Sequence, residues 1–72
     1  MTTKVTHPEN LIKGKRYEFK RRIGEMTCTM TGIFDHLWIC GKEIKIVFNC
    51  DSGAWNGVLG HLSFNGTLIR EI

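Results

Sequence analysis

Hydrophobic and polar residues alternate along much of the chain, which predicts strands. The first clear run is 16–22, where Tyr17 and Phe19 alternate with charged residues. A period of two is that of a strand with one face against a core. This run therefore predicts a strand with an aromatic inner face and a mostly cationic outer face.

The alternation resumes at residue 26 and runs to a glycine. Met26, Cys28 and Met30 are predicted to point inward, with threonines between them pointing outward. Gly32 then interrupts the pattern, which predicts a bulge or a sharp bend. Residues 33–40 are apolar on both faces, as expected where a strand crosses between two sheets, and Trp38 is predicted to lie in the core.

Three more segments complete the pattern. Residues 43–49 alternate again and predict a strand after a tight turn. Residues 49–60 hold three of the eight glycines and predict a loop. Residues 61–72 predict a terminal hairpin with Asn65 and Gly66 at its tip, because Asn-Gly is a strong hairpin signal. Its core residues would be Leu62, Phe64 and Ile69.

A short helix is predicted ahead of the first strand. In "THPENLIKG", Thr6 and Glu9 have the spacing of a capping box, and Gly14 is a plausible stop. A helix this short is not stable by itself. It should therefore dock on the sheet through Leu11 and Ile12.

Composition agrees with a β-rich fold. Val, Ile, Thr, Phe, Tyr and Trp supply 25 of the 72 residues, against one alanine. We predict one all-β domain over residues 1–72, with residues 1–6 as a flexible N-terminus. Its order of elements resembles a small SH3-like or Sm-like five-stranded barrel, or a strongly bent antiparallel sheet, with a short N-terminal helix. This resemblance is architectural, covers about residues 8–72 and implies no functional residue; an OB-fold and an open sheet with one helix are the alternatives.

Several classes of protein do not fit the sequence. No segment approaches about 18 consecutive apolar residues, so we predict no membrane span. The N-terminus lacks the pattern of a signal peptide. Three cysteines are an odd number without a dense framework, which favours reduced thiols and a cytoplasmic location.

Metal binding and catalysis find little support. The possible ligands have the spacing C-x7-H-x3-C-x9-C, and only His36 and Cys40 are as close as the paired ligands of structural zinc sites. No established catalytic or phosphate-binding motif is present. We predict no enzyme, no cofactor and no small-molecule substrate. The weak metal candidates are Cys28, His36, Cys40 and Cys50.

Charge is concentrated at one end of the chain. Residues 1–22 carry seven of the ten Lys and Arg residues, and the net charge is +3. Cations beside aromatic residues suit RNA or single-stranded DNA. We predict a non-enzymatic binding module for nucleic acid or a nucleoprotein machine, with Trp38 and Trp55 as stacking candidates. Its predicted contacts are Lys13, Lys15, Arg16, Lys20, Arg22, Lys45 and Trp55. The simpler explanation is that the charges only protect a strand edge from pairing.

A protein-binding role is the alternative. Trp55 lies in the polar, glycine-rich segment "DSGAWNG", where a large aromatic residue either caps the core or anchors a partner. Under this hypothesis the chain is a regulator or inhibitor of a cellular enzyme, of the kind that viruses or mobile elements encode. Its partner would be an acidic protein surface. The oligomeric state is not predicted.

Overall fold

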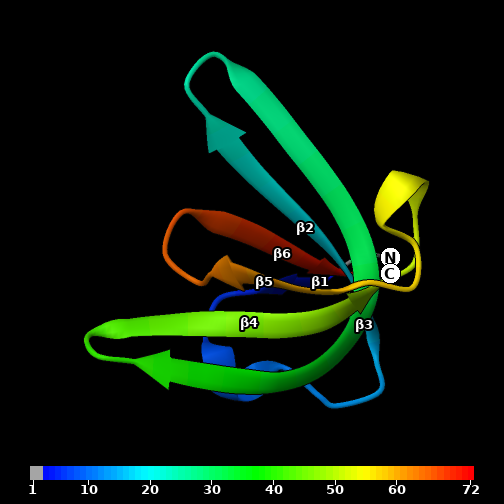
Figure 1. The fold of residues 1–72 in the computed structure, drawn as a ribbon. Coiled ribbons are helices and arrows are strands. Elements are labelled where there is room, and N and C mark those ends of the chain that lie inside the picture. Colours follow the sequence, from blue (N-terminus) through cyan, green and yellow to red (C-terminus); the bar gives the residue numbers. More distant parts are fainter. Residues whose placement is uncertain (1–2) are drawn as a thin grey trace.

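The computed structural model describes residues 3–72 and shows an all-β protein with one antiparallel sheet (Figure 1). The strand order is β1-β6-β2-β3-β4-β5. Two short 3₁₀ turns, η1 and η2, lie between strands. The elements are β1 (Thr3–Val5), η1 (Pro8–Asn10), β2 (Arg16–Ile23), β3 (Met26–Cys40), β4 (Glu43–Cys50), η2 (Gly53–Trp55), β5 (Leu59–Ser63) and β6 (Thr67–Glu71).

The long strand β3 bends and joins two halves of the sheet (Figure 1). Its first half pairs with β2 and its second half with β4, and Gly32 has a partner in both, Tyr17 and Cys50. A Cβ atom at Gly32 would lie 2.6 Å from the Asn49 carbonyl oxygen and 2.7 Å from Phe48 Cδ2. The bend predicted at Gly32 is therefore a point where only glycine fits between the two halves.

The bend brings the inner faces of β2 and β4 together and forms the core. Phe19 stacks on Phe48 with ring centroids 4.3 Å apart, and Tyr17 meets Phe34 edge-on at 6.4 Å. The Tyr17 hydroxyl accepts a 2.9 Å hydrogen bond from the backbone N–H of Ile12, so its one polar atom is satisfied. The core residues are Leu11, Tyr17, Phe19, Phe34, Ile46, Phe48, Cys50 and Ile69.

The all-β prediction is confirmed, but the closed five-stranded barrel is wrong. The sheet has six strands and remains open, with β1 at one edge and β5 at the other. The N-terminal segment contributes β1, which pairs with β6 from Thr3 to Val5, while residues 1–2 lie outside the described residues. No helix in the described part of the chain is long and apolar enough to span a membrane.

The predicted N-terminal helix is not seen either. Only η1 forms, its preceding residue His7 makes no side-chain cap, and Leu11 is already extended. The segment after it instead bonds to β3: Gly14 N–H donates to the Phe34 carbonyl and Phe34 N–H to the Lys15 carbonyl, each at 2.9 Å. These tertiary hydrogen bonds replace those of a helix that is too short to be stable alone.

The C-terminal hairpin was also predicted wrongly. A turn does form near Asn65 and Gly66, but β5 pairs with β4 and β6 pairs with β2 and β1. The two strands diverge after the turn because each completes a different half of the sheet. Their apolar residues nevertheless join the core as predicted: Leu62, Phe64 and Ile69.

Trp38 lies outside the core, contrary to prediction. The pairing of β3 with β4 shifts between Phe34 and His36, so Asp35 has no partner across the ladder. This bulge reverses the inward and outward positions that follow it. Leu37 consequently packs on the core, and Trp38 is 46% exposed on the outer face.

The contact at Gly32 predicts a strong effect of one methyl group. Gly32→Ala should lower the free energy of unfolding by about 2 kcal/mol, because backbone and a core ring must both move to admit the new atom. Gly60→Ala is the matched control in β5, since its Cβ would meet only the Phe48 ring at 3.6 Å. Its stability should stay within about 1 kcal/mol of the wild type. Urea unfolding followed by circular dichroism measures both, and equal effects would contradict the proposed role of Gly32.

Candidate functional site

Three cations from three adjacent strands meet on the outer face of the first half of the sheet. Lys4 in β1 pairs in register with Arg70 in β6, and Leu68 of β6 pairs with Lys20 in β2. Together these four side chains line a shallow groove of about 190 Å³. Arg70 also bonds Glu18 at 2.5 Å, which neutralises part of its charge. We refer to Lys4, Lys20, Leu68 and Arg70 as the cationic groove.

Two of the predicted contact residues are bound to carboxylates. Arg16 Nε donates to Asp51 at 2.7 Å, and the Thr31 hydroxyl donates to the same carboxylate at 2.6 Å. These hydrogen bonds, from Arg16 first, hold the pKa of Asp51 below its usual value. Lys15 forms an ion pair with Glu71, and that hydrogen bond raises the pKa of Lys15. Both cations therefore link the start of β2 to residues that are distant in sequence.

The remaining predicted cations are dispersed. Arg22 donates from Nε to the Gly24 carbonyl of its own turn at 3.1 Å. Lys13 is exposed in the loop before β2, where its charge contributes to the lowered pKa of Asp35, whose main cause is a hydrogen bond with His36. Lys45 is on the outer face of β4, with Nζ 5.3 Å from the Trp38 ring centroid.

A second surface, mostly apolar, surrounds β5. On its inner side a concavity of about 160 Å³ is lined by Met30, Trp55, Val58, Gly60 and other residues. Trp55 is 63% exposed, so it forms a wall of this concavity and does not cap the core.

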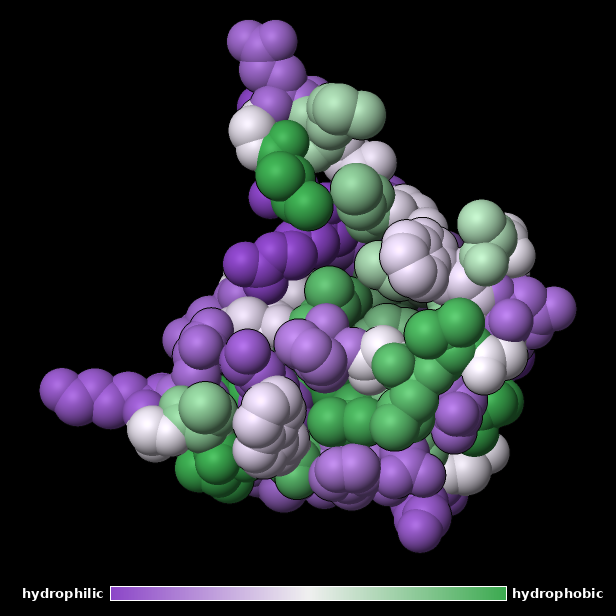
Figure 2. All heavy atoms as spheres, viewed as in Figure 1, coloured by the Kyte–Doolittle hydropathy of each residue, from purple (hydrophilic) through white to green (hydrophobic). Residues whose placement is uncertain are grey.

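The outer side of β5 has a concavity of about 320 Å³, lined in part by His36, Trp38, Leu59 and His61. Trp38 meets His61 edge-on, with ring centroids 5.7 Å apart. Figure 2 shows hydrophobic side chains gathered on this side of the molecule. Gly60 and His61 line both concavities, so the two are separated only by the edge strand.

The structure separates the weak metal candidates. Cys50 is buried in the core, Cys40 is exposed at the end of β3, and Cys28 is half-buried; all three are free thiols. Among residues 3–72 no three or more His, Cys, Asp or Glu side chains are placed to hold a metal ion.

Sequence reasoning missed Lys4 and Arg70 as residues of the groove, and it missed the link that Arg21 makes to the segment after β5. Lys4 lies in the segment predicted to be flexible, and Arg70 lies in a predicted hairpin that does not form. Arg21 occupies an inward position of β2 and donates from Nη1 to the carbonyls of Ser63 and Asn65, at 3.4 and 3.1 Å. The alternation in β2 does place Arg21 on the core side, and a cation on that side was the available signal.

Comparison of the chain with protein-family models, curated proteins and solved structures gives no match. The candidate surfaces therefore rest on the chemistry and geometry of the residues themselves.

The pair of Asp51 with Arg16 predicts a pH dependence of stability. The pKa of Asp51 is lowered by folding, so its ion pair stabilises the protein above the unfolded-state value, about 4, and this is lost as pH falls through the folded-state pKa. The Asp51→Asn variant should therefore be less stable than the wild type near pH 7. Its stability should also fall less than that of the wild type between pH 6 and pH 2. Urea unfolding across this range measures it, with Glu25→Gln at the β2–β3 turn as the control for charge. A wild-type pH profile in Asp51→Asn would show that the pair has no role.

Proposed function

We propose that this protein is a non-enzymatic module that binds RNA, single-stranded DNA or a nucleoprotein through the cationic groove. The observation that carries the proposal is the convergence of Lys4, Lys20 and Arg70 from three strands on one face. Phosphate groups attract such a cluster without any requirement for sequence. A reducing, cytoplasmic compartment fits the three free cysteines.

The residues around the groove suit contacts with the sugar-phosphate backbone of a nucleic acid more than contacts with its bases. Leu68 is 52% exposed at its centre and offers an apolar contact to sugars, and the outward threonines of β3 add hydroxyl groups on the far side of β2. Neither tryptophan lines this groove. We therefore expect binding that is sensitive to salt and largely independent of sequence.

The proposal predicts the effect of removing the three cations. A Lys4→Ala, Lys20→Ala, Arg70→Ala triple variant should bind single-stranded RNA more weakly and with a smaller salt dependence. If each cation contacts one phosphate, the slope of log K against log salt should fall by about 2 for single strands. Fluorescence anisotropy with a labelled 20-nucleotide RNA at several salt concentrations measures both quantities.

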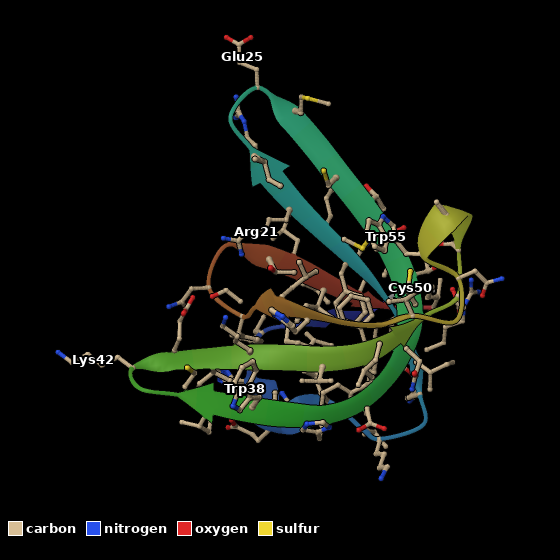
Figure 3. The ribbon with its side chains drawn as sticks, viewed as in Figure 1. Arg21, Glu25, Trp38, Lys42, Cys50 and Trp55 are labelled. Carbon is tan, nitrogen blue, oxygen red and sulfur yellow. The ribbon has the colours of Figure 1, made fainter. Side chains whose placement is uncertain are left out.

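Lys42 supplies the control for this experiment. It is exposed at the β3–β4 turn, away from the groove (Figure 3). Lys42→Ala removes one positive charge and should leave the slope nearly unchanged. An equal loss per charge removed in the two variants would indicate an effect of net charge alone, and absence of binding by the wild type at low salt would refute the function.

Protein binding through Trp55 is the second candidate function. The exposed indole beside an apolar concavity favours it, because such aromatic side chains are common anchors in interfaces. Under this proposal the chain is a regulator or inhibitor whose contact includes η2 and the start of β5.

A single substitution tests whether Trp55 is available to a partner. Trp55→Ala should change the free energy of unfolding by no more than about 1 kcal/mol, because the side chain is mostly exposed. Thermal and urea unfolding measure this, with Phe48→Ala as the comparison that removes a core ring. A loss as large as that of Phe48→Ala would place Trp55 among the residues needed for folding.

A further inference from the structure

The edge strand β5 presents backbone groups that are not used by the sheet. Phe64 N–H donates to the Ile44 carbonyl at 2.8 Å, and Cys50 N–H donates to the Val58 carbonyl at 3.0 Å. Hydrogen-bonded pairs alternate along an antiparallel ladder, so Gly60 and Leu62 also bond to β4. The N–H and C=O groups of the residues between them must point away from the sheet: Leu59, His61 and Ser63.

The end of this edge at Ser63 is already occupied. Its carbonyl accepts hydrogen bonds from Arg21 Nη1 at 3.4 Å and from the Thr67 hydroxyl at 2.6 Å. Within residues 3–72, Leu59 and His61 pair only with β4, and they do so at positions where the two strands exchange no hydrogen bond. The free stretch of edge therefore runs from Leu59 to His61, at the position where the sheet fails to close.

The two concavities are arranged for an extended chain along this stretch. Successive side chains of a strand point to opposite faces. A strand added beside β5 would place one side chain towards Trp55 and Val58 on the inner side, and the next towards Trp38 and Leu59 on the outer side. Unpaired backbone groups for affinity and pockets on alternate faces for selectivity are the two elements of recognition by strand addition.

The β2–β3 hairpin extends over the inner side of the same edge (Figure 1). Its outer part, residues 22–27, projects beyond the rest of the sheet, and Ile23 and Met26 on its inward face are 59% and 72% exposed. Met30, further along the same face, lines the inner concavity with Gly60. Figure 2 shows that the molecule is hollowed between this hairpin and the strands below it. Flexible methionine side chains can adapt to the surface of a bound chain.

Charge indicates the chemistry of the partner. Arg21 lies at the Ser63 end of the edge and Trp55 near the other end (Figure 3). Arg21 has no carboxylate partner among the described residues, and it donates from Nη1 to the Ser63 and Asn65 carbonyls and to the Thr67 hydroxyl. No Asp or Glu lines either concavity. A carboxylate on the partner would therefore find an unneutralised cation beside the free edge.

We propose that the Leu59–His61 edge of β5 binds an extended segment of a protein partner as an added strand. The segment carries apolar side chains at alternate positions and an acidic residue near Arg21. This inference rests on the second proposed function, protein binding, and adds the mode of binding and the class of ligand.

The test begins with a displayed library of linear ten-residue peptides selected on the nuclease-treated protein. Selected peptides should carry alternating apolar residues and an Asp or Glu near one end. The tightest is synthesised and its Kd measured, and amide hydrogen exchange of the protein is followed with and without it. Exchange at Leu59 and His61 should slow in the complex, because these N–H groups become hydrogen-bonded.

Two substitutions at one position separate the backbone from the side chain. Leu59→Pro removes an outward N–H that β4 does not use, and proline is tolerated on a strand edge of this kind. Leu59→Ala is the matched control, which removes the side chain and keeps the N–H. The proline variant should bind the peptide about tenfold more weakly than the alanine variant. Arg21→Gln should weaken the binding of peptides that contain the acidic residue more than the binding of the same peptides with Asn or Gln at that position.

Each other result contradicts the proposal in a distinguishable way. Peptides whose binding needs Trp55 but leaves exchange at Leu59 and His61 unchanged would retain the protein-binding function and refute strand addition. Failure to select any peptide would refute both. Slow exchange that depends on protein concentration without peptide, together with a dimer in sedimentation, would identify a second copy of this chain as the occupant. Protection of these amides by single-stranded RNA would instead assign the edge to nucleic acid.

Discussion

The close approach of β4 to β3 at Gly32 is the contact on which the rest of the structure depends. The absent side chain allows the Asn49 carbonyl and the Phe48 ring to occupy the space where a Cβ would be. The strand can therefore bend, and the two halves of one sheet turn their inner faces towards each other. The stack of Phe19 on Phe48 follows from this bend, and most of the small core surrounds it. A chain of this length has few such contacts, so loss of one is felt throughout.

Because the sheet bends without closing, β5 remains an edge strand. Side chains form hydrogen bonds with only some of its outward-pointing backbone groups. Arg21 reaches from β2 to the Ser63 carbonyl and links the two halves where no backbone ladder does. Towards Leu59 the inner side of β5 faces a concavity that is lined in part by Met30 and Trp55. The result is a surface in which unpaired backbone groups and exposed apolar side chains lie together. Edges of this kind are commonly shielded by charge or proline when they are not used.

The cationic groove and the two apolar concavities lie on different strands of this fold. The outward positions of β1, β6 and β2 carry Lys4, Arg70 and Lys20, whereas β5 is flanked by tryptophans. A polyanion and an extended peptide would therefore use different faces of the molecule. This separation is compatible with a module that docks on a nucleoprotein and contacts both of its components.

The sequence by itself determined the strands over residues 16–22, 26–40 and 43–49, the bend at Gly32 and core residues such as Tyr17, Phe19 and Ile69. Those features follow from local rules: a period of two in hydrophobicity, and a glycine that interrupts it. Tertiary structure decided what local rules do not specify. The bulge at Asp35 moved Trp38 from the core to the surface, and long-range pairing sent β5 and β6 to opposite halves of the sheet. The cations of the N-terminal third have different roles for the same reason. Asp51 and Glu71, which are distant in sequence, neutralise Arg16 and Lys15. Lys20 instead lies in the groove with Arg70.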